Sequence, residues 1–164
     1  MLAKTLQESI DAWAGFYQDS TPTHIGLQFL HIGGLLGAGG LAISSDRDLI
    51  RQRSADPAHR VMHLAHQRGV HGAVLAGLAI VTLSGLGFLF ADLDTYLVST
   101  PFWIKMALVA TLIVNGVWMV RLERTLVAEP TRDREWARMR LAAILSVVLW
   151  FATTLLGAVL TNAA

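Results

Sequence analysis

Histidines recur at helical spacing in two parts of this chain. His24, Gln28 and His31 stand at positions i, i+4 and i+7 of the apolar stretch HIGLQFLHIGG, so on a helix they share one stripe. A polar stripe in a membrane helix normally faces protein or ligand rather than lipid, and imidazole nitrogen is a ligand for iron and copper. This stripe is therefore a candidate binding face for a haem or a related cofactor.

A second interpretation of His31 needs no ligand. A histidine inside an apolar helix can be buried and hydrogen-bonded to a hydroxyl group on a neighbouring helix. The hydroxyl-bearing residues expected at a similar depth are Ser84, Thr111, Thr153 and Thr154. His24 is expected near the end of its helix, where an imidazole costs little.

A second group of histidines occupies HRVMHLAHQRGVH. Three of them repeat the i, i+4, i+7 spacing and the fourth lies off that stripe, and the i, i+4 pair is a known metal-ligand spacing. The candidate ligands for zinc or copper are His59, His63, His66 and His71. The alternative is a solvated, partly cationic helix extension whose neighbours Arg60 and Arg68 bind lipid headgroups.

Depth argues against one haem shared by the two groups. His31 is expected about nine residues inside one end of its helix, and His71 about twenty residues from the same end of the next. At about 1.5 Å per residue, these positions differ in depth by roughly 15–20 Å. The two histidines are therefore predicted to belong to separate sites.

Lys105, in the stretch PFWIKM, is expected at the depth of Gln28. It either extends to the surface or points inward, where its charge would suit a carboxylate, a haem propionate or a quinone oxygen. Met106 stands at the same level as a possible second iron or copper ligand beside His24 or His31. Asn115, deeper in the same segment, is expected to pack and form hydrogen bonds.

Composition predicts an all-α membrane protein. Of 164 residues, 54% are hydrophobic and 15% are charged, against about 25% charged in a soluble domain. Four apolar segments are long enough to cross about 30 Å of hydrocarbon, and each must be helical. Within residues 21–164 these segments are about 23–44, 69–91, 102–120 and 141–161. The absence of cysteine excludes disulfides and iron–sulfur clusters.

Residues 1–20 are predicted to form an amphipathic helix rather than a signal peptide, because charged residues interrupt them. Their apolar residues at helical spacing are Leu2, Leu6, Ile10, Trp13 and Tyr17. Such a helix lies on a membrane surface or packs on the bundle. The sequence thus predicts a bundle of four transmembrane helices with an N-terminal amphipathic helix.

Charge predicts the orientation of the bundle. Residues 45–68 hold five arginines and residues 121–140 hold six, whereas ADLDTYLVSTP holds no basic residue. The positive-inside rule places both arginine-rich segments in the cytoplasm and both termini outside it. The acidic residues among these arginines are expected to form exposed ion pairs of little energetic value. They are Asp46, Asp48, Glu123, Glu129, Asp133 and Glu135.

Glycine is frequent in the first two apolar segments. Gly33 and Gly37 form a small-xxx-small pair, which is typical of close helix packing. A second interpretation is that bare backbone makes room for a flat ligand such as a porphyrin. No hydrolytic motif or phosphate loop is present, and we assign no catalytic residue.

Two stretches carry a resemblance to known proteins. LHIGGLLGAGGLAISSDRDL resembles the first span of small four-helix bacterial membrane proteins, and GLAIVTLSGLGFLFADLDTYLVSTPFWIKMALVATLIVNGVW resembles their second and third spans. The first-span histidine and the lysine that opens the third span are similar to those in the membrane part of the copper-resistance D (CopD) family. The resemblance implies a four-span protein of the bacterial inner membrane with His31 and Lys105 as functional positions. The chain lacks that family's methionine- or histidine-rich outer loop, which argues against copper import.

These observations leave three functional hypotheses. The first is a redox-associated, electron-transport-type membrane protein that binds a b-type haem, or a related tetrapyrrole or quinone, between its helices. The second is a non-catalytic accessory subunit, whose glycine-rich faces pack against other membrane subunits or a second copy. The third is copper or zinc handling by the second histidine group. In each case the arginines face membrane lipid, and no nucleic acid partner is expected.

Overall fold

A computed structural model describes residues 2–51 and 56–163 of the chain, which form helices and no strand. The elements are α1 (Leu2–Asp19), α2 (Thr21–Arg51), α3 (Pro57–Ala91), α4 (Leu93–Val98), α5 (Thr100–Ala128) and α6 (Asp133–Ala163). The all-α prediction is confirmed, including the helix at the N-terminus. The short helix α4 was not predicted and lies in the connection between α3 and α5.

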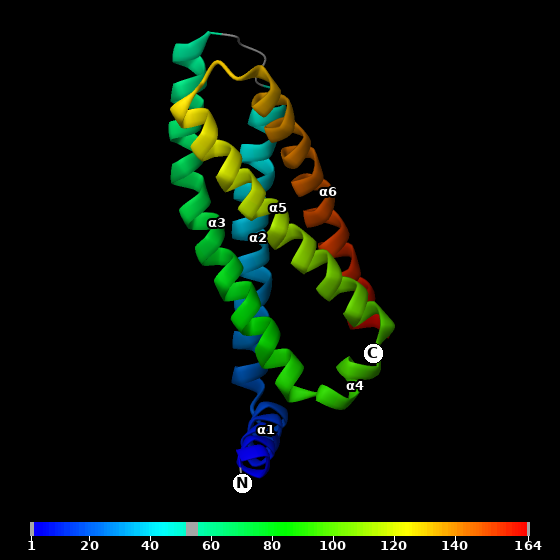
Figure 1. Cartoon of the computed structure of the whole chain (residues 1–164). Helices are drawn as coiled ribbons and strands as arrows, with labels where there is room; N and C mark the ends of the chain where they lie inside the picture. Colours follow the sequence, from blue (N-terminus) through cyan, green and yellow to red (C-terminus); the bar gives the residue numbers. More distant parts are fainter. Residues whose placement is uncertain (1, 52–55, 164) are drawn as a thin grey trace.

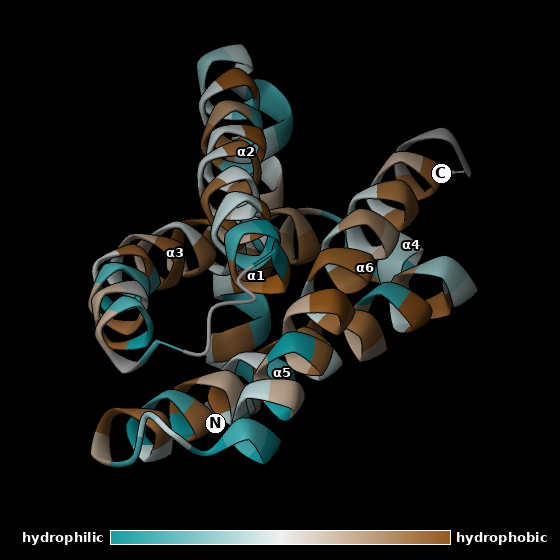
Figure 2. Cartoon of the chain, turned by 90° about the horizontal axis from the view of Figure 1, so that it is seen from above, coloured by the Kyte–Doolittle hydropathy of each residue, from teal (hydrophilic) through white to brown (hydrophobic). Residues whose placement is uncertain are grey.

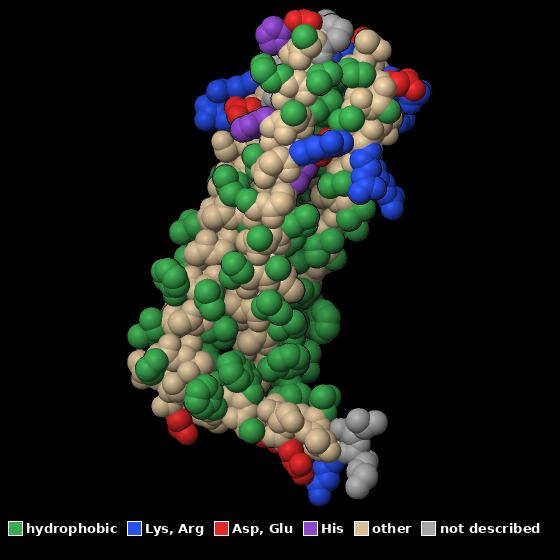
Figure 3. Space-filling view, turned by 90° about the vertical axis from the view of Figure 1, so that its left-hand side faces the viewer, with side chains coloured by type: hydrophobic (Ala, Val, Ile, Leu, Met, Phe, Trp, Pro, Cys, Tyr) green, Lys and Arg blue, Asp and Glu red, His purple; other side chains and the backbone are tan. Residues whose placement is uncertain are grey.

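Four of these helices, α2, α3, α5 and α6, are long and apolar enough to cross a membrane, which indicates a multi-pass membrane protein. Large hydrophobic side chains are exposed along them; Phe29 on α2 and Leu83 on α3 are examples. Figure 2 shows hydrophobic residues, in brown, all along these helices. In Figure 3 hydrophobic side chains cover the middle of the molecule, and charged side chains gather at its two ends.

The four long helices form two antiparallel pairs, α2 with α3 and α5 with α6, and α6 also packs on α2. The pairs meet near the end that holds the arginines, hereafter the arginine end, and diverge toward α1 and α4 (Figure 1). Helix α1 and the last turns of α6 lie at the end where the pairs diverge, hereafter the open end, and α1 packs there against α3 and α2. This arrangement agrees with the predicted placement of both termini on one side.

Helix α3 extends well beyond the apolar segment predicted from residue 69. It begins at Pro57, and the carboxylate of Asp56 caps it by accepting a hydrogen bond from the backbone N of Ala58 at 3.1 Å. Asp56 also lies 2.6 Å from Nδ1 of His59, so the cap is braced by a side chain one turn into the helix. The second histidine group therefore belongs to one continuous helix with the second span.

Acidification is expected to loosen the first turn of α3. The hydrogen bond to His59, and then that from Ala58, lower the pKa of Asp56 below its usual value. A carboxylate with a lowered pKa stabilises the fold above its unfolded pKa of about 3.9, and this contribution disappears as the pH falls through the lower folded pKa. Amide protection at Ala58 and Arg60 should therefore fall in that acid range. The variant Asp56→Asn should lose this pH dependence; an unchanged dependence in that variant would contradict the assignment.

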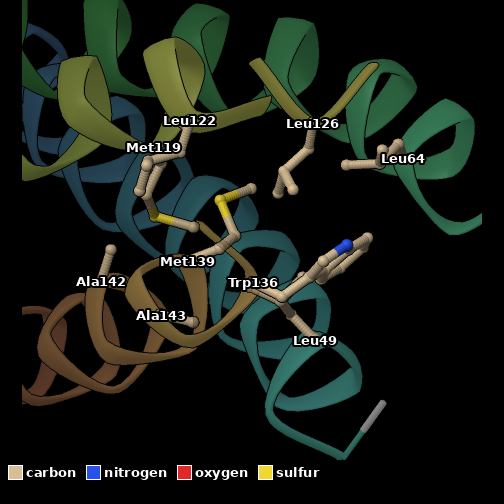
Figure 4. Packing of buried hydrophobic residues seen from close by; sticks show 9 residues of the cluster. All are labelled: Leu49, Leu64, Met119, Leu122, Leu126, Trp136, Met139, Ala142 and Ala143. Atoms are coloured by element: carbon tan, nitrogen blue, oxygen red, sulfur yellow. The ribbon is translucent and has the colours of Figure 1, made fainter. Parts of the chain in front are cut away.

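The core consists of two hydrophobic clusters. The arginine-end cluster comprises Leu49, Leu64, Met119, Leu122, Leu126, Trp136, Met139, Ala142 and Ala143 (Figure 4). The mid-span cluster comprises Ala38, Ala42, Leu112, Leu149 and Trp150. The arginine-end cluster joins all four long helices. The bundle is thus closed at the arginine end.

The close glycine contacts differ from those predicted. A Cβ atom at Gly33 or Gly37 would meet nothing within 4 Å, so these two glycines do not pack the described helices together. The close approach is at Gly77 of α3, where an added Cβ would lie 2.7 Å from Cβ of Ala38 on α2. Glycine is needed at position 77 because the two helix backbones nearly touch there.

Candidate functional site

His31 is hydrogen-bonded between helices. Its Nδ1 lies 2.9 Å from Oγ of Ser84 on α3. This confirms the predicted hydrogen bond from a buried histidine to a hydroxyl, and it selects Ser84 among the four candidate partners. The bond ties α2 to α3 in the half of the bundle nearer α1.

The hydrogen bonds of Ser84 favour one tautomer of His31, with the proton on Nδ1. The Ser84 hydroxyl has one hydrogen, and its oxygen lies 2.7 Å from the carbonyl of Ile80 and 3.1 Å from that of Val81. When the hydroxyl donates to one of these carbonyls, its oxygen accepts from Nδ1–H of His31, and the backbone of Val81 also acts on the ring as an acceptor. Neutral imidazole then carries its free lone pair on Nε2. That atom is available as a ligand or a hydrogen-bond acceptor.

Aromatic rings continue from His31 toward α1. The ring of Phe88 on α3 meets His31 edge-on, with centroids 5.5 Å apart. Tyr17 of α1 contacts Phe88 at 6.3 Å and stacks on His24 at 3.8 Å. Helix α1 is anchored here because Nε1 of Trp13 donates to the carbonyl of Gly87 at 2.9 Å. The predicted amphipathic helix therefore packs on the bundle and covers this flank of His31.

Lys105 turns into the bundle from α5. Its side chain is half-buried, and its Nζ would lie 3.5 Å from a Cβ atom built on Gly157 of α6. It is also close enough to His31 for their charges to interact. Lys105 thus acts electrostatically on His31 from the other helix pair. We call His31, Ser84, Phe88 and Lys105 the outer site.

The other predicted cofactor residues are placed differently. Gln28 is exposed on α2, and His24 is exposed but stacked on Tyr17. Met106 is 40% exposed and lies next to Lys105 in the chain. The outer site as described is therefore built from His31 and Lys105, and from none of these three side chains.

The histidines at the arginine end have separate surroundings. His59 pairs with Asp56, His66 is exposed, and Nδ1 of His71 lies 2.9 Å from Oε2 of Glu123. The side chain of His63 lies outside the described residues. Among the side chains that are described, no three His, Asp or Glu residues are grouped closely enough to hold a metal ion.

The structure confirms that His31 and His71 lie at different depths in the bundle. His31 contacts Ser84 on that helix, and His71 lies thirteen residues earlier. Thirteen residues of helix span about 20 Å. His31 and His71 therefore lie too far apart to ligate one iron.

A buried polar layer near the arginine end was not predicted. It contains side chains from all four long helices: Ser45, Asp46, Gln67, His71, Asn115, Glu123 and Ser146. Asp46 and Glu123 are each only 4% exposed, so the expectation of exposed ion pairs was wrong for both. We call this set the polar layer.

Two contacts in the polar layer join helices. Glu123 of α5 accepts from Nε of Arg68 at 2.8 Å and faces His71, both on α3. Ser45 of α2 donates to Oε1 of Gln67 at 2.6 Å, and Gln67 returns a bond to the carbonyl of Ser45. These contacts satisfy buried polar groups and fix how α2 and α5 sit against α3.

The burial of Glu123 could have been recognised from its helical spacing relative to core residues. It stands four residues after Met119 and three before Leu126, two members of the arginine-end cluster. These three residues share one helix face, so Glu123 follows the core into the bundle. Asp46 lies three residues before Leu49 of the same cluster and could have been recognised in the same way.

A groove of about 300 Å³ lies between α1 and α3. It is lined by Leu6, Ser9, Ile10, Trp13, Gly87 and Phe90. Its lining is apolar, and none of the residues of the outer site belongs to it.

No family model matches this chain, and comparison with curated proteins and with solved structures also gives no match.

Proposed function

We propose that this protein is redox-associated and binds a b-type haem, or a related tetrapyrrole or quinone, at the outer site. The observation that carries the proposal is the hydrogen bond from Nδ1–H of His31 to Ser84, which leaves the Nε2 lone pair free for iron or for a quinone hydroxyl. Metal-ligating histidines characteristically donate their other N–H in this way.

Lys105 supports an anionic or carbonyl-bearing ligand. Its ammonium group is held inside the bundle near His31, where an unpaired positive charge is unfavourable unless a partner compensates it. A haem propionate or a quinone oxygen would be that partner. A bound haem would supply one-electron chemistry, while His31 and Lys105 would fix its position.

The proposed orientation follows the arginines. The arginines of the described residues lie at or near the arginine end, and we propose that this end faces the cytoplasm across a bacterial inner membrane. The outer site would then lie in the half of the bundle nearer the opposite surface.

An absorption spectrum of the purified full-length protein tests the proposal. We expect a Soret band that shifts on dithionite reduction and disappears in His31→Ala. His66→Ala removes an exposed histidine and should leave the band unchanged. A quinone would instead appear on organic extraction, and His31→Ala should lower its recovered amount.

Two further variants separate ligation from folding. Ser84→Ala removes the acceptor for Nδ1–H and should weaken haem binding by about 10–100-fold. Lys105→Gln should weaken binding while the reduced spectrum keeps its shape, because the iron ligand is retained. A Soret band that is unchanged in His31→Ala would refute the assignment of His31 as the ligand. A colourless protein without quinone that co-purifies with other subunits would replace this function with an accessory role.

A further inference from the structure

Asp46 is a buried carboxylate with an unpartnered oxygen. It lies between Ala42 of the mid-span cluster and Leu49 of the arginine-end cluster, and it is 4% exposed. Its Oδ2 is buried and has no hydrogen-bond partner among the described residues. The side chain of Ser146 on α6 lies near enough to the carboxyl group to act on it.

Asn115 of α5 presents a second unpartnered oxygen at the same level. It lies between Leu112 and Met119, which belong to the same two clusters, and it is 3% exposed. Its Nδ2 donates to the carbonyl of Ala142 at 3.0 Å, but its Oδ1 has no partner among the described residues. Two buried acceptors without donors thus occur in one layer.

Both side chains converge on one turn of α6. Asp46 contacts Ser146, Asn115 contacts Ala142, and these two α6 residues are four positions apart. Positions i and i+4 lie on the same helix face, one turn apart. The two unpartnered oxygens therefore approach the same face of α6 from α2 and from α5.

The charges around Asp46 do not neutralise it. Helix α2 is packed against α3 and α6 at this level. On α3, Arg68 and His71 are both held by Glu123 of α5. On α6, Arg140 has an interaction of its own, and no ion pair joins Asp46 to a described basic side chain. An ionised carboxylate buried without a counter-charge is strongly unfavourable.

We propose that Asp46 is a proton-binding site, and that it carries its proton on Oδ2 with Asn115 Oδ1 as the acceptor. One proton removes the buried charge and supplies the donor that both oxygens lack. A calcium ion would need six to eight oxygen ligands, whereas the layer leaves two without partners. On release, the O–H bond breaks and the proton passes to water, which becomes hydronium.

The arginine end is the side with which this proton exchanges. Arg47 and Asp48 follow Asp46 directly and are exposed, so α2 reaches solvent within one turn of the site. His31, in the outer site, lies fifteen residues earlier on the same helix, about 22 Å away. The proton site is therefore independent of any ligand bound at His31.

Infrared spectroscopy of the full-length protein in detergent at neutral pH tests this assignment. A protonated carboxyl gives a C=O stretching band that carboxylates lack and that shifts in D₂O. We expect Asp46→Asn to remove this band. Asp48→Asn, which deletes an exposed carboxylate two residues away, should leave it intact. A spectrum with no such band, or a band that survives Asp46→Asn, overturns the proposal.

Milder variants keep the test usable if Asp46→Asn does not fold. Asn115→Leu removes the acceptor of the proton, and Ser146→Ala removes the hydrogen bond to the carboxylate; each should shift the band in frequency without abolishing it. A band that neither variant moves belongs to another group and refutes the assignment. A different outcome is that sodium chloride stabilises the protein more than potassium chloride does, and that Asp46→Asn abolishes this difference. That result would show that a metal cation occupies the site instead.

Discussion

Replacing both Arg68 and His71 by alanine is expected to lower the free energy of unfolding by about 3–5 kcal/mol. The cause is Glu123, whose side chain is 5% exposed and, among the described residues, pairs with these two basic side chains. Removing both partners leaves an uncompensated charge in the arginine end of the bundle. Unfolding of the full-length protein in mixed detergent micelles, followed by circular dichroism, measures the change.

Two controls separate this effect from the loss of surface charge. Arg132→Ala breaks an exposed pair with Glu129 and should change stability by less than about 1 kcal/mol. Adding Glu123→Leu to the double variant removes the stranded carboxylate and should restore most of the stability. A double variant as stable as the original protein would show that Glu123 reaches solvent or takes up a proton without cost.

The helical architecture could be predicted because apolar length and spacing are local properties of the chain. The helix ends could not be predicted from hydropathy alone. Helix α3 begins at Pro57 and α5 continues to Ala128, beyond the predicted apolar segments, because amphipathic turns there contribute Leu64 and Leu126 to the core. Capping by Asp56 fixes one of these ends, and that signal is present in the sequence.

The outer site was partly predictable from depth. His31 and Ser84 stand at matching positions in consecutive antiparallel segments, and their hydrogen bond was among the expected outcomes. The polar layer was missed because Asp46 and Glu123 were assigned to arginine-rich loops by composition. In the structure both residues belong to helices, and their faces follow the periodicity of Leu49 and Leu126. The number of charged residues characterises a whole segment, whereas the burial of one side chain depends on the helix face on which it lies.

Trp136→Ala is expected to cost about 3–5 kcal/mol, the usual range for truncating a buried tryptophan. Trp136 is 2% exposed at the start of α6 and belongs to the arginine-end cluster (Figure 4). Its Nε1 donates to the carbonyl of Pro130 at 2.9 Å, and the guanidinium of Arg60 lies 5.4 Å from its ring centroid. Because Arg60 also binds Asp133 at 2.7 Å, truncating this ring loosens the junction between α3 and the α5–α6 connection.

Variants of graded size test whether the ring or its N–H group matters more. Trp136→Phe keeps most of the packing and loses the hydrogen bond to Pro130. It should therefore lower the free energy of unfolding by about 1 kcal/mol more than the loss of buried apolar area alone predicts. Trp103→Ala is the matched control, because Trp103 is 56% exposed on α5, and its effect should be much smaller. The same micelle unfolding assay compares all three variants. Equal costs for Trp136→Ala and Trp103→Ala would mean that Trp136 does not hold the arginine end together.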